Sequence, residues 1–427
     1  MNKNEAILWL EQQISHPVVT PKRIDTLAQM RSDFQALKYP QVAIYGTGSG
    51  GLRLKAILEK QNIKIAYFVD SFSNQSTDGI PTYLPSDAPN DNLPLLISST
   101  WFVDILKGID QTTLGKGDNI FVIPDPSFLT TDIFDDMVGY EFYSTFIRRF
   151  EDYKAVWSLL EDSHSKQTFL KVCAYRLGFF SPQNLSDAVL PMTSYQYQKT
   201  TREVPKLPAS FENGLSRATK ECFGHPHYII DDFSAPKRGD HVFDCGAWEG
   251  DTTFWYHHFV GKEGKVYAFE PSQFNCHRLR QQLKLSSSDT YIHVEPIAIG
   301  AINETQYWDD VPEAGTCSRL SSKNTGMRVD VESIDSFCER TNVQKVDILK
   351  TDLEGADFDA IKGAFKTISQ FKPQLAVSIY HTADQMVDIP LWINKNFPDY
   401  RLRINHNHMG VNETICLAVP HDRNSRT

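Results

Sequence analysis

The sequence lacks the cysteine spacing that a structural zinc site or a disulfide framework would need. Its cysteines are scattered, odd in number and never spaced as Cys-x-x-Cys. This usage fits a reducing compartment, so we expect a cytoplasmic protein without a structural metal site. The seven cysteines are Cys173, Cys222, Cys245, Cys276, Cys317, Cys338 and Cys416.

A long apolar run and an excess of positive charge are also missing. No segment approaches the roughly 20 consecutive apolar residues that cross a bilayer, so no membrane span is expected. Residues 1–20 are polar and amphipathic, which is typical of a helix and not of a signal peptide. The net charge of −10 argues against nucleic acid or an anionic membrane as the main partner, because both bind basic surfaces.

The chain does contain one pattern twice: a β-branched strand, a glycine-rich turn, a helix and a second strand that ends in an acid. The first copy has its strands at 42–45 and 65–70, and the second copy has them at 241–244 and 266–270. Each copy is the opening β-α-β unit of a parallel, doubly wound sheet. A length of 427 residues suits two such domains.

The stretch between the two copies has helical spacing and no strand pattern. We therefore predict an α/β protein with two doubly wound, Rossmann-like parallel-sheet domains joined by a helical connector. The predicted boundaries are 1–135 for the first domain with its leading helix, 136–210 for the connector and 211–427 for the second domain. Further strands are expected at 95–98, 119–123, 291–294, 346–350 and 374–379, followed by a helix after Leu391 and a closing pair around 400–404 and 414–419.

The first glycine loop has the form of a dinucleotide fingerprint. Gly46, Gly48 and Gly51 follow a strand and open a helix, and Asp70 ends the next strand. In this context the glycines let the backbone approach a phosphate, the helix N-terminus attracts it, and the acid can hold a ribose diol. A nucleotide or nucleotide-sugar site is one interpretation; the other is a turn kept for packing that binds nothing.

The second glycine loop differs in a way that has a physical meaning. Asp244 ends the strand, and only two glycines, Gly246 and Gly250, follow it. The acid would repel a pyrophosphate, but it can hold the ammonium group of S-adenosylmethionine (SAM), directly or through water. Glu270 ends the next strand and is placed to accept hydrogen bonds from a ribose. The loop alone leaves NAD as an alternative.

The rest of the C-terminal half contains several short blocks in a fixed order. They are 244–252, 269–272, 298–300, 348–357, 363–364 and 378–381. Taken together, these blocks resemble the FkbM family of methyltransferases over about residues 220–420. Asp357 stands where that family commonly has Glu, and Cys245 where it usually has Val, Ile or Ala.

The resemblance implies a class I SAM-dependent methyltransferase fold, commonly one that methylates sugar hydroxyls of glycans or secondary-metabolite scaffolds. The acceptor would be a sugar or glycan. The first domain in turn resembles small Rossmann-like domains that precede bacterial sugar acyltransferases and methyltransferases, which implies a nucleotide or nucleotide-sugar ligand there. Carried over block by block, the cofactor site would include Asp244, Gly246, Ala247, Gly250, Asp251, Thr252, Glu270, Ala298, Ile299, Asp352 and Glu354.

Two residues are candidates for the chemistry. Asp352 and His381 each end a strand, and such strand ends face the same crevice of a doubly wound sheet. An alcohol has a pKa far above neutral, so a positioned base helps methyl transfer. His381 is the better base by its intrinsic pKa, whereas Asp352 either takes the proton or orients the cofactor. His225 and His227 precede the first strand and are expected to be solvated.

Two other functions stay open at this stage. A nucleotide-sugar-binding or NAD-type protein could act through the first loop, but the catalytic Tyr/Lys or Cys/His set that it needs is not evident near 46–70. A non-catalytic SAM-binding protein could retain the methyltransferase fold. The acceptor and the oligomeric state, including a homo-oligomer, are not fixed by the sequence.

Overall fold

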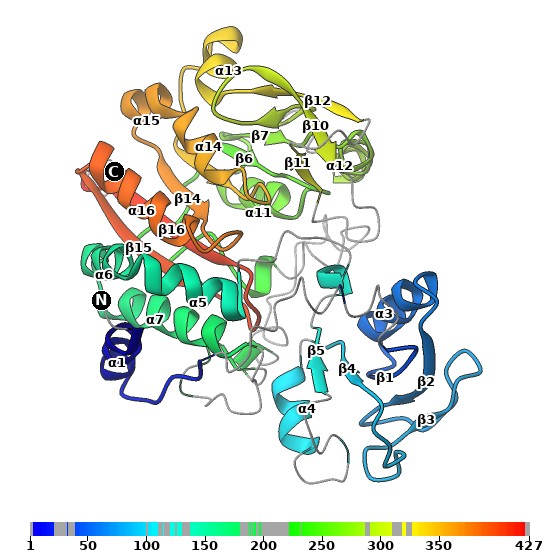
Figure 1. The fold of residues 1–427 in the computed structure, drawn as a ribbon. Coiled ribbons are helices and arrows are strands. Elements are labelled where there is room, and N and C mark those ends of the chain that lie inside the picture. The colour runs from blue at the N-terminus through cyan, green and yellow to red at the C-terminus, as the bar shows by residue number, and fades with distance from the viewer. Residues whose placement is uncertain are drawn as a thin grey trace. The chain divides into compact units, whose positions relative to one another are not determined.

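The computed structural model of the chain forms two compact units, each of which contains helices and strands (Figure 1). The first comprises Met1–Arg148, Lys171–Ser194 and Met409–Val411, and the second comprises Arg149–Leu170, Tyr195–His408 and Asn412–Thr427. The structure describes residues 3–20, 32, 39–99, 101–109, 114, 120–123, 126–129, 137–179, 188, 190, 192–193, 196–197, 222–230, 232–286, 291–309, 318–321 and 327–422.

The first unit is built on a parallel sheet in the order β3-β2-β1-β4-β5. Its strands are almost fully apolar, as expected when a parallel sheet is covered on both faces. The strands β2 and β3 lie on one side of β1, and β4 and β5 lie on its other side. The strand order therefore reverses between β1 and β4. The strands are β1 (Gln41–Tyr45), β2 (Lys64–Val69), β3 (Thr82–Tyr83), β4 (Leu95–Ile97) and β5 (Ile120–Val122).

Helices connect and flank these strands. The α3 helix follows β1 directly after the glycine loop, and α4 joins β4 to β5. Strands are found where the sequence predicted them at 42–45, 65–70 and 95–98, and the described part of 119–123 is a strand too. The other elements here are α1 (Lys3–Ile14), α3 (Ser49–Lys60), α4 (Phe102–Ile109), η1 (Pro126–Leu129) and α5 (Gly139–Arg148).

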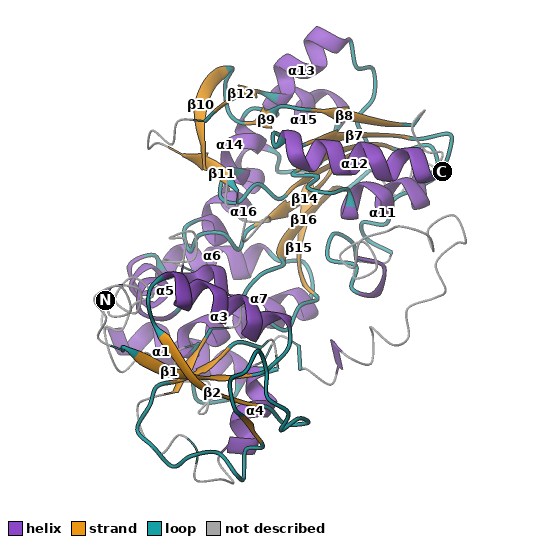
Figure 2. Cartoon of the chain, turned by 90° about the vertical axis from the view of Figure 1, so that its right-hand side faces the viewer, coloured by secondary structure: helices purple, strands orange, loops and turns teal. Residues whose placement is uncertain are grey.

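The second unit contains a seven-stranded sheet in the order β15-β16-β14-β13-β6-β7-β8. All neighbours are parallel except β16, which runs antiparallel to β14 and β15. Helices lie on both faces of this sheet (Figure 2), so the predicted α/β fold class is confirmed. Its strands are β6 (His241–Cys245), β7 (Lys265–Phe269), β8 (Ile292–Glu295), β13 (Ile348–Thr351), β14 (Gln374–Ser378), β15 (Tyr400–His406) and β16 (Thr414–Pro420).

The helix that the sequence predicted after Leu391 begins earlier. It starts at Gln385 and contains Pro390. The helices of the second unit are α6 (Phe150–Leu159), α11 (Asp251–Val260), α12 (Gln273–Ser286), α13 (Ile334–Thr341), α14 (Asp357–Lys362), α15 (Phe365–Phe371) and α16 (Gln385–Asn396). The helix α7 (Ser163–Gly178) begins in the second unit, and its residues from Lys171 on belong to the first.

A small second sheet in this unit was not predicted. It has the order β11-β10-β12-β9. Its strands expose many of their side chains, so they lack the apolar pattern that identifies a strand in a sequence. They are β9 (Ala298–Ile299), β10 (Glu304–Asp309), β11 (Arg319–Ser321) and β12 (Arg328–Glu332).

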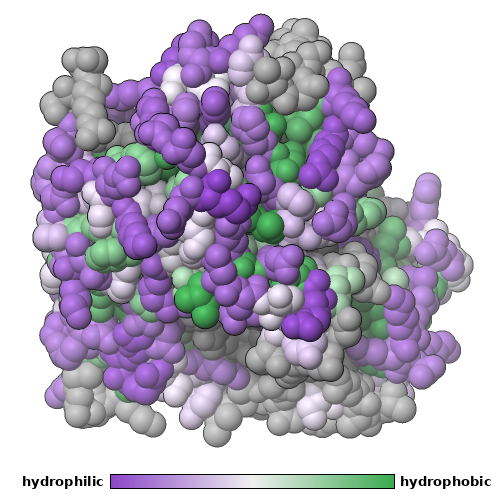
Figure 3. All heavy atoms as spheres, turned by 90° about the horizontal axis from the view of Figure 1, so that it is seen from above, coloured by the Kyte–Doolittle hydropathy of each residue, from purple (hydrophilic) through white to green (hydrophobic). Residues whose placement is uncertain are grey.

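In the part of the chain that the structure describes, no helix combines the length and the apolar character needed to cross a bilayer. Hydrophilic side chains dominate the face drawn in Figure 3, with hydrophobic ones scattered among them. The helices α5, α6 and α7 lie within the predicted connector, whereas the predicted domain boundaries stay predictions.

Candidate active site

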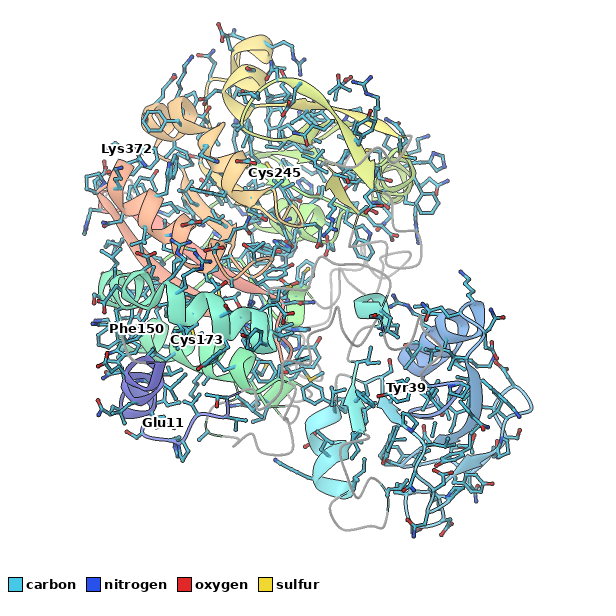
Figure 4. The ribbon with its side chains drawn as sticks, viewed as in Figure 1. Glu11, Tyr39, Phe150, Cys173, Cys245 and Lys372 are labelled. Atoms are coloured by element: carbon cyan, nitrogen blue, oxygen red, sulfur yellow. The ribbon has the colours of Figure 1, made fainter. Side chains whose placement is uncertain are left out.

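The second glycine loop leaves the carboxyl end of β6, where Figure 4 labels Cys245. Gly246 and Gly250 have φ of +83° and +96°, which favour glycine. A Cβ on Gly246 would come 1.9 Å from the carbonyl oxygen of Asp352, and one on Gly250 would come 2.3 Å from Leu279. Both glycines are therefore required by neighbouring protein atoms, before any ligand is considered.

Asp244 is held inside the protein by its own neighbours. Its carboxylate lies 3.0 Å from the ammonium group of Lys350, and both side chains are almost completely buried. Thr252 and Thr253, in the first turn of α11, donate hydrogen bonds to the same carboxylate at 2.6–3.0 Å. Asp244 thus joins β6 to β13 and to α11, and its predicted contact with a ligand ammonium stays a prediction.

The other loop residues predicted to bind the cofactor lie around this pair. Ala247 and Thr252 are buried. Asp251 begins α11, and burial raises its pKa to about 6, against the opposing effect of Lys350. The carboxylate of Asp251 also accepts a weak hydrogen bond, 3.8 Å long, from the thiol of Cys222.

Glu270 lies at the end of β7, as predicted for an acid that faces a ribose. It accepts hydrogen bonds from the backbone N–H of Trp248 and of Ser272 at 3.0 and 2.8 Å. Trp248 belongs to the glycine loop and has φ of +43°, so Glu270 fixes the loop as well as its own strand end. Burial raises the pKa of Glu270 to about 7, although these donors and Asn275 act to lower it.

Asp352 follows β13 and is surrounded by donors. The hydroxyl groups of Tyr228 and Tyr380 donate to it at 2.7 and 3.0 Å, and Nε2 of His381 lies 3.3 Å from its Oδ1. Burial acts to raise the pKa of Asp352, but His381, Lys350 and the two tyrosines together hold it below its usual range. Asp352 is therefore an oriented carboxylate anion.

His381 is buried at the end of β14, between acids on both sides of its ring. Its Nδ1 lies 2.9 Å from Oδ2 of Asp357, which is also fully buried. Its Nε2 faces Asp352 at 3.3 Å and Glu354 at 3.6 Å without a well-aligned hydrogen bond in the described structure. Burial alone would lower the pKa of His381, but Asp357 and Glu354 raise it to about 9.

Two more acids belong to this cluster. Glu354 adopts φ of +50°, and burial raises its pKa to about 8 although His381 opposes this. Glu413 lies just before β16, and the carbonyl of the next residue, Thr414, accepts the N–H of Ile379. Glu413 is therefore beside the end of β14. Its Oε2 is buried without a hydrogen-bond partner among the described residues, and burial raises its pKa strongly.

We expected Asp352 and His381 to face one crevice and Glu354 to lie close to Asp352, and in the structure both acids lie within 3.6 Å of Nε2 of His381. We did not predict the residues that contact these three. Asp357 was noted only as a departure from the family pattern, and its place two residues after Gly355 in the same block was the available signal. Lys350 belongs to the same block. Tyr228 and Glu413 come from distant segments and had no signal, because only the folded chain brings them to this strand edge.

Other predicted residues have plainer surroundings. Ala298 and Ile299 are buried in β9, paired with β12 in the small sheet. His225 is also buried, and its ring stacks on Tyr197 with centroids 3.9 Å apart, so the expectation that it is solvated was wrong. Within the described ranges no group of three His, Cys, Asp or Glu side chains could hold a metal ion.

The first glycine loop, in the other unit, has a different character. Gly46 has φ of +105°, and a Cβ on Gly51 would come 1.9 Å from the carbonyl oxygen of Gly46. Among the described residues, a Cβ on Gly48 would meet no atom within 4 Å. Asp70 accepts hydrogen bonds from the N–H and the hydroxyl of Thr47 at 3.0 and 2.7 Å, so it holds the loop.

Comparison with known proteins gives one family and several structures. Residues 244–406 match the family described as the Methyltransferase FkbM domain. No functionally curated protein matches the sequence. The crystal structure of a methyltransferase FkbM from Methylobacillus flagellatus KT is similar over 97% of this chain and 99% of that one, with 19% identity and a TM-score of 0.58. This likeness shows a shared fold.

More distant similarity covers only about half of the chain. A putative rRNA-methylase from Clostridium thermocellum is 13% identical, over 48% of this chain and 97% of its own, with a TM-score of 0.32. A methyltransferase from Geobacter sulfurreducens is 10% identical, over 54% and 97%, also with a TM-score of 0.32.

Proposed function

We propose that the C-terminal half of this chain transfers a methyl group from SAM to a hydroxyl group of a sugar or glycan. The premise is its methyltransferase FkbM domain, matched over residues 244–406. The observation that carries the proposal is the line of side chains Asp357, His381 and Asp352, which follow the ends of β13 and β14 and begin α14. SAM would supply the activated methyl group, which leaves the protein to orient an acceptor and to remove its proton.

The described residues fit a positively charged ligand with a ribose. Asp352 is an oriented anion. Three further carboxyl groups have raised pKa values and would ionise more readily beside a bound cation, namely those of Asp251, Glu354 and Glu413. The unpartnered Oε2 of Glu413 is the kind of buried acceptor that a bound donor would satisfy. Glu270 presents a fixed carboxyl group where a ribose diol would be held.

His381 is built as a base that can be switched on. Asp357 fixes its Nδ1 side, so that Nε2 faces the crevice. With a pKa of about 9, the imidazole is protonated at neutral pH and pairs with the acids around it. A cation placed beside Asp352 would compete for that negative charge and lower the pKa of His381. The neutral imidazole could then accept the proton of an alcohol.

Transfer of label tests this proposal directly. The protein would be incubated with SAM that is radiolabelled on its methyl group and with glycan fractions, and label is expected in glycan. His381→Asn should lower kcat/KM by about 10²- to 10⁴-fold, whereas His421→Asn, an exposed control, should not. Label that appears only in protein or RNA would disprove the sugar acceptor. SAM binding with no transfer to any acceptor would favour a non-catalytic protein.

The role of Asp357 is separable from that of the base. Asp357→Asn should lower kcat by about 10- to 100-fold and move the pH profile to lower pH, because the imidazole loses the charge that raises its pKa. An unchanged pH profile with a reduced rate would mean that Asp357 only supports the fold.

The binding of SAM at pH 8 should also release protons, because the bound cation lowers the pKa of His381. Calorimetry in buffers of different ionisation enthalpy measures this release.

A further inference from the structure

We propose that the first unit binds a nucleoside diphosphate group, as found in a dinucleotide or a nucleotide-sugar, at its glycine loop and at the carboxyl ends of β1, β2 and β4. The proposal does not depend on methyl transfer. It rests on three features of the described residues: open space over one glycine, a buried hydroxyl without a partner among them, and an exposed aromatic ring beside an acid.

The open space lies over Gly48. Three other glycines of the loop are explained by the protein itself: Gly46 by its φ of +105°, Gly50 by the carbonyl oxygen of Ser98 at 2.8 Å from a Cβ, and Gly51 by Gly46. Gly48 has φ of −72° and ψ of −174°, which any residue can adopt, and a Cβ there would meet no atom of the described residues within 4 Å. A phosphate that approaches the backbone would supply the missing reason for glycine at this position.

The start of α3 is ready to receive an anion at the same place. Gly48 is the N-cap of this 12-residue helix, and no side chain caps it. The first N–H groups of a helix have no partner within the helix, and its dipole favours negative charge there. These features only permit an anion.

Ser98 provides the independent sign of a ligand. It follows β4, next to β1, at the point where the strand order reverses and where doubly wound sheets bind ligands. Its side chain is 3% exposed, and its Oγ has no hydrogen-bond partner among the described residues. That Oγ lies 3.3 Å from the Cβ position of Gly50, in the first turn of α3. A buried hydroxyl normally has a partner, and a phosphate oxygen at the helix N-terminus would be one.

The nucleoside part is suggested by Asp70 and Phe72. Asp70 follows the end of β2, the second strand of the unit, where an acid holds the ribose diol in dinucleotide-binding sheets. The hydroxyl of Thr47, which now donates to Asp70, can rotate away and leave an acceptor for the ribose. Phe72 follows two residues later with its side chain 97% exposed, although an aromatic ring of this size is usually partly covered. A stacked base would cover it.

The ligand class follows from these groups together. The glycine loop and Ser98 would bind a pyrophosphate. Asp70 would bind a ribose with a free 2′-hydroxyl, and Phe72 would stack on a base of any kind. A 2′-phosphate beside the Asp70 carboxylate would be repelled. NADP⁺ is therefore expected to bind more weakly than NAD⁺. ADP, UDP-glucose and NAD⁺ all contain a nucleoside diphosphate group. Comparing their affinities shows whether the group comes from a nucleotide, a nucleotide-sugar or a dinucleotide.

The test uses the full chain and calorimetry with ADP, UDP-glucose, NAD⁺ and inorganic pyrophosphate. At least one nucleotide should bind more tightly than pyrophosphate, and SAM at saturating concentration should not displace it. Ser98→Ala should weaken that binding about tenfold or more without lowering Tm, because it removes a hydroxyl that has no hydrogen-bond partner in the described part of the chain. Gly48→Val should abolish binding. Ser86→Ala, which changes an exposed hydroxyl of the same unit, and Gly108→Val, at another glycine with open space, are the controls.

The opposite results are equally clear. No binding of any nucleotide at millimolar concentration would overturn the proposal. So would unchanged nucleotide affinity in both Ser98→Ala and Gly48→Val, or displacement of the nucleotide by SAM, which would assign it to the second unit. None of these results bears on methyl transfer, because SAM binding and label transfer are measured separately and should be unaffected by either variant.

Discussion

The two glycine loops of this chain occupy the same place in a shared pattern of strand, glycine-rich turn, helix and strand. They differ in the reason why their glycines are needed. In the second unit Gly246 and Gly250 are both demanded by protein atoms, the carbonyl of Asp352 and the side chain of Leu279. In the first unit Gly48 has open space around it. A glycine motif therefore specifies the path of the backbone, and only the surroundings show whether a ligand or the protein occupies the space gained.

The acids that accompany the loops differ as well. Asp244 is buried against Lys350, so its charge is neutralised within the protein. Asp70 is half-buried, and the donors of Thr47 and Phe72 outweigh burial and lower its pKa. Glu270, which ends the second strand of its own unit as Asp70 does, has its pKa raised to about 7 by burial. The same position thus holds an anion in one unit and a carboxyl group near half-ionisation in the other.

The largest expected effect separates the two kinds of glycine. Gly246→Ala places a Cβ 1.9 Å from a backbone oxygen, at a φ of +83°, so we expect the second unit to lose more than about 4 kcal/mol or to fail to fold. Gly48→Ala should cost only about 1 kcal/mol, because Gly48 is the N-cap of α3 and alanine caps a helix less well than glycine. Thermal unfolding followed by tryptophan fluorescence measures both. Equal losses in the two variants would contradict the contrast between the loops.

The next effect tests the buried pair of the second loop. Lys350→Met removes the ammonium group from Asp244 and leaves a buried carboxylate that two threonines alone must stabilise. We expect a loss of about 3–5 kcal/mol, measured by urea unfolding. Lys350→Met combined with Asp244→Asn should recover much of it. A single variant as stable as wild type would mean that Asp244 is neutral in the fold.

The sequence predicted the sheets well because buried parallel strands read as short apolar runs. It also identified Asp352, Glu354 and His381, which lie at or just after strand ends of one sheet. It missed the small sheet because β10 to β12 expose polar side chains. The last helix was placed too late, after Leu391, whereas it begins at Gln385 and includes Pro390.

The contacts within the site lay beyond the sequence for a physical reason. Tyr228 reaches Asp352 across 124 positions of the chain, and nothing local marks it as a donor. Asp244 showed the opposite difficulty. Its place at a strand end suggested a free acid, whereas Lys350 on the neighbouring strand already pairs with it. Charge at a position is visible in a sequence, but the partner that neutralises it is not.

A smaller effect concerns the pH dependence of the second unit. The folded pKa of Glu270, about 7, lies above its unfolded value of 4.5, so the folded state loses stability as pH rises between these values. Glu270→Gln should remove this loss. Relative to wild type, the variant should gain about 2 kcal/mol between pH 5 and pH 8. A constant difference in Tm between variant and wild type over this range would contradict it.

The smallest effect has the opposite sign and belongs to the first unit. The pKa of Asp70 is lowered in the folded state, so its contribution is present above its unfolded value of 3.8 and is lost as pH falls through the folded value. Asp70→Asn should therefore destabilise the loop by about 1 kcal/mol at pH 7, since the amide cannot accept from Thr47 and Phe72 at once. Amide hydrogen exchange in β1 and β2 measures this locally. The difference should shrink as pH falls below about 4; if it grew instead, both acids would respond to burial alone, and the contrast between the two loops would disappear.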